Sequence, residues 1–220
     1  MTTNTFSRYV AGFILLSIAL GGCAAFRDDK RTAITSWPLP NTAKKQSINI
    51  VLNGKAWINE KEIPADKVQS NQLGPWRMQA NQAYMESGLF SEVRLASEEP
   101  ADLQADITIE QRAEFSETLS FILGLTFGLS SLIIPQKGTD TFIVTASFKD
   151  KAGHVLAASK QTETVATWTQ LFFVFAMPFR DGPDTTATAA LYDLHRALLQ
   201  DFHQKHLRAG SARIDQVATR

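Results

Sequence analysis

The sequence predicts an α+β fold: a largely antiparallel sheet with two helices on one face. Two observations carry this prediction. Alternating apolar and polar residues recur at 48–52, 103–111 and 142–148, which is typical of strands with one buried face. Two other segments, one before Gly88 and one after Pro183, carry apolar residues at helical spacing. The resulting order of strand, helix, strand, strand, hairpin and helix favours a single α+β domain.

The first strand is expected over Ile48–Leu52 and is expected to meet a turn at Asn53-Gly54. Residues 59–71 are polar and are expected to be irregular. Pro75 suits the first turn of a helix and Gly88 suits its left-handed cap. The apolar face of this helix is expected to consist of Trp76, Ala80, Ala83 and Tyr84.

Short strands are expected at 90–96 and 103–111. The alternating segment 142–148, a turn at 150–153 and a Thr-rich run through Ala166 together predict one long antiparallel hairpin. Gly182-Pro183-Asp184 then introduces the last helix. Its apolar stripe is formed by Ala187, Leu191, Leu194, Leu198 and Phe202.

Composition excludes several classes of protein. The chain has 220 residues, 22 basic and 22 acidic residues and a single Cys, so it is neither disulfide-stapled nor uniformly basic, and we expect no nucleic-acid partner. Gly-rich phosphate loops and Gly-x-Ser-x-Gly elbows are absent from the sequence. His203 and His206 share a helix face, but a solvated helix end is the preferred interpretation. We therefore expect no enzyme activity, no cofactor and no metal.

The first 23 residues have the layout of an export signal. Arg8 precedes a mainly apolar run, Tyr9–Leu20, which is shorter than the ~20 residues that a membrane-spanning helix needs. Leu20-Gly21-Gly22-Cys23 resembles the lipobox of bacterial lipoproteins. In that family the Cys thiol is joined to diacylglycerol, the chain is cut before the Cys, and the new amino group is acylated, for example with palmitate. The resemblance implies that Cys23 is the lipid-attachment residue.

The same resemblance implies a location. By the family's sorting habit, Ala24 after the Cys implies the outer membrane of a Gram-negative cell, with the protein on its periplasmic face and the lipid bilayer as partner through acylated Cys23. The expected division is a signal peptide at 1–22, a flexible lipidated tether at 23–46, a periplasmic domain at 47–208 and a flexible tail at 209–220. Within the tether, residues 37–40 either stay in solvent or dock onto the domain.

Two apolar runs, at 119–134 and 168–179, interrupt the amphipathic pattern. Each large apolar side chain gains ~1.5–3 kcal/mol on burial, so these runs must be covered by the core, by the bilayer beside Cys23 or by another protein. Because the flanking strands are neighbours in the expected hairpin, both runs should leave the sheet at the same end. The residues expected to contact the membrane are Phe121, Leu125, Phe127, Leu129, Phe172, Phe173 and Phe175.

A second resemblance starts at 86–93, where a helix ends in Ser-Gly-x-Phe and turns into a short strand. Together with Ala105-Asp106 and the long hairpin, this order is similar to the small α+β domains of periplasmic lipoproteins, among them the curli secretion channel component and the activators of penicillin-binding proteins. It implies a non-catalytic envelope assembly or binding component whose partner is an envelope protein or a second copy. The alternative is a lipid or small-ligand carrier in which the apolar runs line a pocket.

Overall fold

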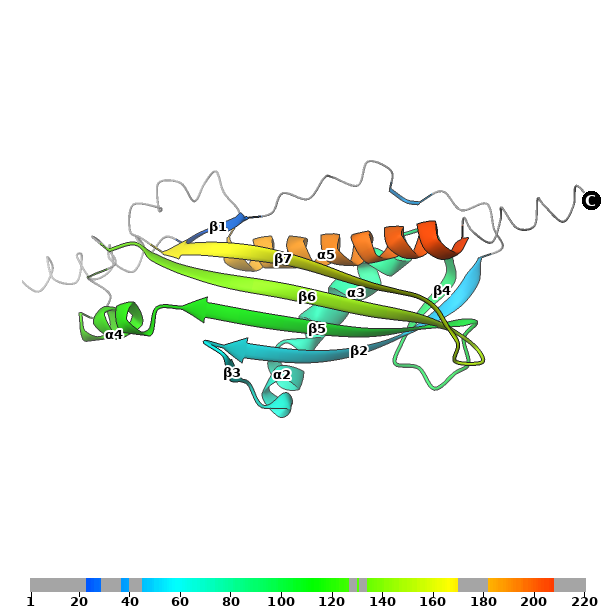
Figure 1. Cartoon of the computed structure of the whole chain (residues 1–220), viewed down its shortest axis with the longest axis horizontal. Helices are drawn as coiled ribbons and strands as arrows, with labels where there is room; N and C mark the ends of the chain where they lie inside the picture. Colours follow the sequence, from blue (N-terminus) through cyan, green and yellow to red (C-terminus); the bar gives the residue numbers. More distant parts are fainter. Residues whose placement is uncertain are drawn as a thin grey trace, which may run out of the picture.

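The computed structural model describes residues 23–28, 37–39, 45–126, 130, 134–169 and 182–207, and these form one sheet with helices against it (Figure 1). The strands are β1 (Cys23–Arg27), β2 (Gln46–Ile58), β3 (Lys61–Glu62), β4 (Phe90–Leu95), β5 (Leu103–Phe115), β6 (Gln136–Asp150) and β7 (Val155–Thr169). The helices are α2 (Ala65–Asn71), α3 (Leu73–Glu86), α4 (Glu117–Leu125) and α5 (Pro183–Phe202), which continues into the π-helical turn η4 (His203–Leu207). The α+β class predicted from the sequence is confirmed.

The strand order is β1-β7-β6-β5-β2-β3, and β4 also pairs with β2. Strands β5, β6 and β7 form an antiparallel meander, and β1 adds to β7 in the antiparallel direction. Only two pairings in the described part of the chain are parallel, those of β2 with β4 and with β5. The expectation of a largely antiparallel sheet is therefore confirmed. The parallel pairings all involve β2, which lies between β4 and β5.

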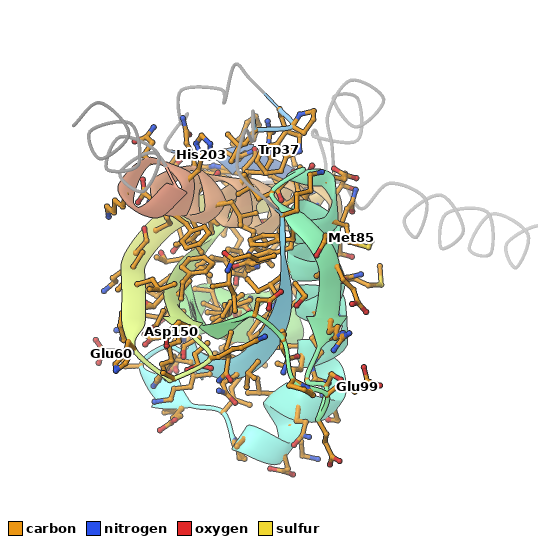
Figure 2. All side chains as sticks on the ribbon, turned by 90° about the vertical axis from the view of Figure 1, so that its right-hand side faces the viewer. Trp37, Glu60, Met85, Glu99, Asp150 and His203 are labelled. Atoms are coloured by element: carbon orange, nitrogen blue, oxygen red, sulfur yellow. The ribbon has the colours of Figure 1, made fainter. Side chains whose placement is uncertain are left out.

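Helices α3 and α5 cover one face of the sheet, as predicted, and the core lies between the two layers (Figure 2). Alternate residues of β2, β5 and β6 point into this layer and are almost completely buried. Three aromatic rings join the elements: Phe148 of β6 lies 4.2 Å from Phe202 of α5 and 6.3 Å from Tyr84 of α3 between ring centres. The buried face of the alternating strands and the apolar sides of the two helices therefore form one core, as the spacing of their apolar residues predicts.

The turn expected at Asn53-Gly54 is wrong. Strand β2 continues through Gly54 to Ile58. A Cβ on Gly54 would lie only 2.7 Å from the Trp76 ring of α3. The glycine is thus required by helix packing and not by a turn. The chain reverses at Asn59 and Glu60, whose positive φ angles of 46° and 67° suit a two-residue hairpin into β3.

The irregular structure expected over 59–71 is also wrong, because β3 and the short helix α2 occupy it. Helix α2 buries Val68 alone, so its sequence carries almost no apolar period. Gly88, by contrast, has the left-handed conformation predicted for a helix cap, with φ of 75°.

Replacing Gly54 by Ala is expected to destabilise the protein by about 1–3 kcal/mol, because the added methyl overpacks against buried Trp76 and Val68. Urea denaturation measures the effect. The matched control is Gly74→Ala in α3, where the new methyl meets no other atom within 4 Å and stability should stay constant or rise by up to about 1 kcal/mol. Equal stability of the two variants would contradict the packing argument.

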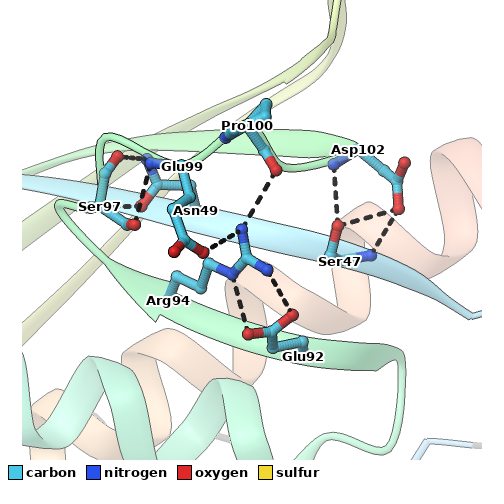
Figure 3. A network of polar contacts seen from close by, with 8 residues as sticks. All are labelled: Ser47, Asn49, Glu92, Arg94, Ser97, Glu99, Pro100 and Asp102. Atoms are coloured by element: carbon cyan, nitrogen blue, oxygen red, sulfur yellow. Dashed lines mark hydrogen bonds and ion pairs between the residues drawn. The ribbon is translucent and has the colours of Figure 1, made fainter.

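At the right-hand end in Figure 1, the connection between β4 and β5 crosses β2 over 96–102. Side chains on the open face of β2 hold this crossing loop (Figure 3). Asn49 exchanges two hydrogen bonds with the Ser97 backbone, at 2.9 and 3.0 Å. The Ser47 hydroxyl donates to Asp102 at 2.9 Å and accepts from its N–H at 3.0 Å. Hydrogen bonds from Lys151 and then from Ser47 hold the pKa of Asp102 well below its usual range.

Part of the segment expected to be a flexible tether is folded. Residues 23–27 form β1 on the edge of the sheet, where Ala24 and Ala25 are buried. Residues 37–39 dock onto the domain: the Leu39 N–H donates to the Ser87 carbonyl at 2.9 Å, and the Trp37 ring lies 4.8 Å from the Arg196 guanidinium. Of the two interpretations of this segment, docking is the one that residues 37–39 adopt, and residue 40 lies outside the described residues.

Candidate functional site

The end of the sheet at which β1 begins gathers several chain segments that are distant in sequence. Cys23 of β1 lies opposite Thr169 of β7, and Thr169 lies opposite Gln136 of β6. One strand further, Phe115 at the end of β5 lies opposite Gly138. The predicted lipid-attachment residue therefore shares a sheet end with the points where both apolar runs leave the strands, on the left in Figure 1. We call this the Cys23 end.

Helix α4 lies at the Cys23 end and is held there by its first turn. The Ser116 hydroxyl caps it by accepting from the Leu119 N–H at 3.2 Å. Asn59 accepts from the Phe115 N–H at 2.9 Å and donates to Glu117 at 3.3 Å. From the other side, the Gln136 amide donates to the Ser120 hydroxyl at 2.8 Å. These bonds tie α4 to the β2–β3 turn and to β6.

None of the nine residues of α4 is buried. Phe121 is 66% exposed and Leu125 is 64% exposed, so the interpretation of this part of the first apolar run as core is wrong. The reason is positional: α4 follows the last residue of β5 and lies beyond the end of the sheet instead of over its face (Figure 1). Of the other expected membrane contacts, Phe127, Leu129, Phe172, Phe173 and Phe175 lie outside the described residues.

The second apolar run begins within β7. Trp168 lies opposite Lys137 of β6, and the Lys137 ammonium is 5.8 Å from the centre of the Trp168 ring. The same ammonium lies 4.0 Å from Asp28, directly after β1. This is a cation–π arrangement with an aromatic ring that stays partly exposed.

Arg27, four residues after Cys23, connects β1 to the interior. Its guanidinium binds both carboxylate oxygens of Glu163 on β7, and its Nη1 donates to Asp193 of α5 at 2.7 Å. Glu163 is completely buried, whereas Arg27 is about a quarter exposed. Burial lowers the pKa of Arg27, but the hydrogen bonds to Glu163 and Asp193 outweigh it and raise the pKa above its ordinary value. We call these three residues the β1 clasp. Sequence analysis missed it.

The described residues line two surface clefts at opposite ends of the sheet. One, of about 500 Å³, lies at the Cys23 end and is lined by Asn59, Glu60, Glu114, Phe115, Lys137 and Thr139. The other, of about 350 Å³, lies between the crossing loop and the β6–β7 turn, with Glu98, Glu99, Asp150 and Lys151 in its lining. Most of the residues that line each cleft are polar, whereas a lipid carrier would need a mainly apolar pocket.

Within the described part of the chain, no three His, Cys, Asp or Glu side chains come together in a way that could hold a metal ion. Over those same residues, no helix combines the length and the apolar character required to cross a bilayer. The charged groups of the β1 clasp are engaged with one another and with Arg196: Arg27 binds Glu163 and Asp193, and Arg196 donates to Asp193 at 3.1 Å. Their arrangement is that of a structural ion-pair network.

No protein-family model and no curated protein matches the chain. Among solved structures, the PelC dodecamer from Paraburkholderia phytofirmans is 14% identical with a TM-score of 0.40, over 84% of this chain and 98% of that one. A neuraminyllactose-binding hemagglutinin homolog from Helicobacter pylori is 12% identical with a TM-score of 0.38, over 86% and 96%. A minor lipoprotein from Acinetobacter baumannii is 13% identical with a TM-score of 0.27, over 75% and 93%. Likenesses at these low scores do not assign a family or a function.

Proposed function

We infer that the protein is a lipid-anchored component of the outer membrane, on its periplasmic face, which binds or assembles with other envelope molecules without catalysing a reaction. The observation that carries the inference is the β1 strand. Cys23, the last residue of the lipobox-like segment, is also the first residue of β1, and the β1 clasp joins this strand to buried Glu163. An acyl group on Cys23 would therefore be attached directly to the folded body.

The position of Cys23 at the start of β1 supports a role at the membrane surface. Residues 24–27 continue directly into the sheet, so at ~3.4 Å per residue the clasp lies only about 14 Å along the strand from the acylated residue. Two or more acyl chains on one residue give stable membrane attachment, whereas a single chain gives only marginal binding. The domain would thus be held close to the lipid surface, where it could meet an envelope partner.

Cys23→Ser is expected to abolish labelling of the protein by radioactive palmitate and to release it from the membrane fraction, because the acceptor sulfur is lost. Labelling is measured in a Gram-negative host, and release is measured by fractionation. The control is Ala25→Ser, two residues along the same strand, which alters β1 but keeps the thiol and should keep the label. Unchanged labelling of the Cys23→Ser protein would disprove the anchor.

A further inference from the structure

We propose that α4 is a membrane-binding helix that inserts its exposed side chains into the lipid leaflet holding the acyl chains of Cys23. The Cys23 end of the sheet would then contact the bilayer, and the strands would extend away from the membrane surface. This inference rests on the proposed lipid anchor, and it adds a second point of attachment and a fixed orientation.

The first support is the distribution of polarity along α4. Its only charged residue, Glu117, lies at the start of the helix and pairs with Lys61 of β3 at 3.8 Å. From Thr118 to Gln136 the sequence has no charged residue. Phe121 and Leu125 are four residues apart, so they project from the same side of the helix, and each is about two-thirds exposed. The polar start of the helix is therefore bonded to the β2–β3 turn and to β3, whereas its exposed apolar side needs an apolar phase.

The second support is proximity to the anchor. Cys23 begins β1, and α4 follows β5, which is three strands away in the sheet. With neighbouring strands ~4.8 Å apart, the two attachment points lie about 15 Å from each other. An acylated Cys23 brings a bilayer to this end of the sheet in any case. The bilayer is therefore the apolar phase that α4 meets first, and we assign it as the occupant in preference to another protein.

The third support is size. Nine residues of helix extend about 14 Å, too short to cross a hydrocarbon core of ~30 Å but suitable for lying in the interface with side chains ~5–10 Å deep. Trp168 and Lys137 lie at the same end, and an aromatic ring beside a basic side chain is typical of the lipid–water boundary. The bonds from Asn59 to Glu117 and from Gln136 to Ser120 fix α4 to the sheet, so insertion would orient the whole domain.

An upright orientation has a further consequence for the opposite end. Strand β7 runs 15 residues from that end to Thr169, so the β6–β7 turn and the crossing loop lie about 45 Å from the lipid surface. The polar side chains of Figure 3 would then face the aqueous compartment and be accessible to a partner.

The test uses the full-length lipidated protein with one new cysteine. Because Cys23 is the chain's only cysteine and acylation removes its thiol, Phe121→Cys would carry the single reactive thiol. It is labelled with the environment-sensitive fluorophore NBD and reconstituted into phosphatidylethanolamine and phosphatidylglycerol vesicles with or without doxyl-labelled lipid. The matched control is Val155→Cys, an exposed apolar residue at the other end of β7. We expect blue-shifted emission and several-fold stronger doxyl quenching at position 121 than at position 155.

Each outcome of this experiment is decisive. Protein that floats with the vesicles but shows no quenching at position 121 would overturn the membrane-binding helix while leaving the anchor intact. A blue shift at 121 without doxyl quenching would assign the exposed side of α4 to a contact with a second copy of the protein and overturn its insertion into lipid. Equal quenching at 121 and 155 would overturn the upright orientation. A protein without the new cysteine that still reacts with NBD at Cys23 and does not float would overturn the proposed function itself.

Discussion

Replacing Arg27 by Met is expected to lower the free energy of unfolding by about 3 kcal/mol, measured by urea denaturation. The substitution keeps most of the aliphatic side chain but leaves the carboxylate of buried Glu163 without the guanidinium that binds both of its oxygens. Removing one partner of a buried ion pair costs ~3–5 kcal/mol, and we expect the lower end because Arg27 and Asp193 keep contact with solvent.

The matched control is Arg94→Met. Arg94 also makes a two-pronged ion pair, with Glu92, but the carboxylate that it binds is about half exposed, whereas Glu163 is completely buried, so the loss of stability should be much smaller than for Arg27→Met. Adding Glu163→Gln to Arg27→Met should restore part of the stability, because a neutral amide is less costly to bury than a carboxylate that has lost its guanidinium. If Arg27→Met and Arg94→Met destabilise the protein equally, the β1 clasp does not hold the strand.

The stability of the protein should fall on acidification because of His195. This residue is completely buried on α5, at 6.2 Å from the Tyr84 ring, and neither ring nitrogen has a hydrogen-bond partner among the described residues. Burial lowers the pKa of His195 from 6.5 to about 4. Above pH 6.5 both states are neutral, and as the pH falls towards 4 only the unfolded chain gains the proton. The free energy of unfolding should therefore drop by about 3 kcal/mol over this range.

His195→Leu isolates this effect from the titration of carboxylates. The variant should be at least as stable as the original protein at pH 7, since it removes two buried nitrogens that lack partners. Its advantage should grow by about 3 kcal/mol between pH 7 and pH 4, as measured by urea denaturation at each pH. A constant difference between His195→Leu and the original protein would rule out the buried neutral histidine.

The elements that sequence analysis predicted well are those whose pattern depends on their own residues. Strands β5 and β6 alternate, α5 carries a stripe ending in Phe202, and Gly88 caps α3 with a positive φ. The turn predicted at Gly54 is wrong because Asn-Gly is a local turn signal, whereas Gly54 lies within a strand. The absence of a side chain there leaves room for Trp76, which belongs to a helix later in the chain. Tertiary packing overrides the local preference at that position.

The Cys23 end was predicted in part. The antiparallel hairpin correctly indicated that both apolar runs leave the sheet at one end, because β6 starts where β7 finishes. Strand β1 was missed because residues 24–27 have no alternation and depend on Glu163, 136 positions away from Arg27. One signal was available: Glu163 occupies an inward position of β7, two residues before buried Val165. A carboxylate at such a position requires a cation from elsewhere in the chain.

The crossing loop over β2 bears on the route by which the chain folds. Strands β4 and β5 flank β2 on both sides, and the connection that joins them passes across it, fastened by Ser47 and Asn49. If β4 and β5 were placed first, β2 would have to insert between them under a crossing loop that is already in position. We therefore expect β2, β4 and β5 to assemble together, with the bonds from Ser47 and Asn49 to the crossing loop closing only when β2 lies between its two neighbours.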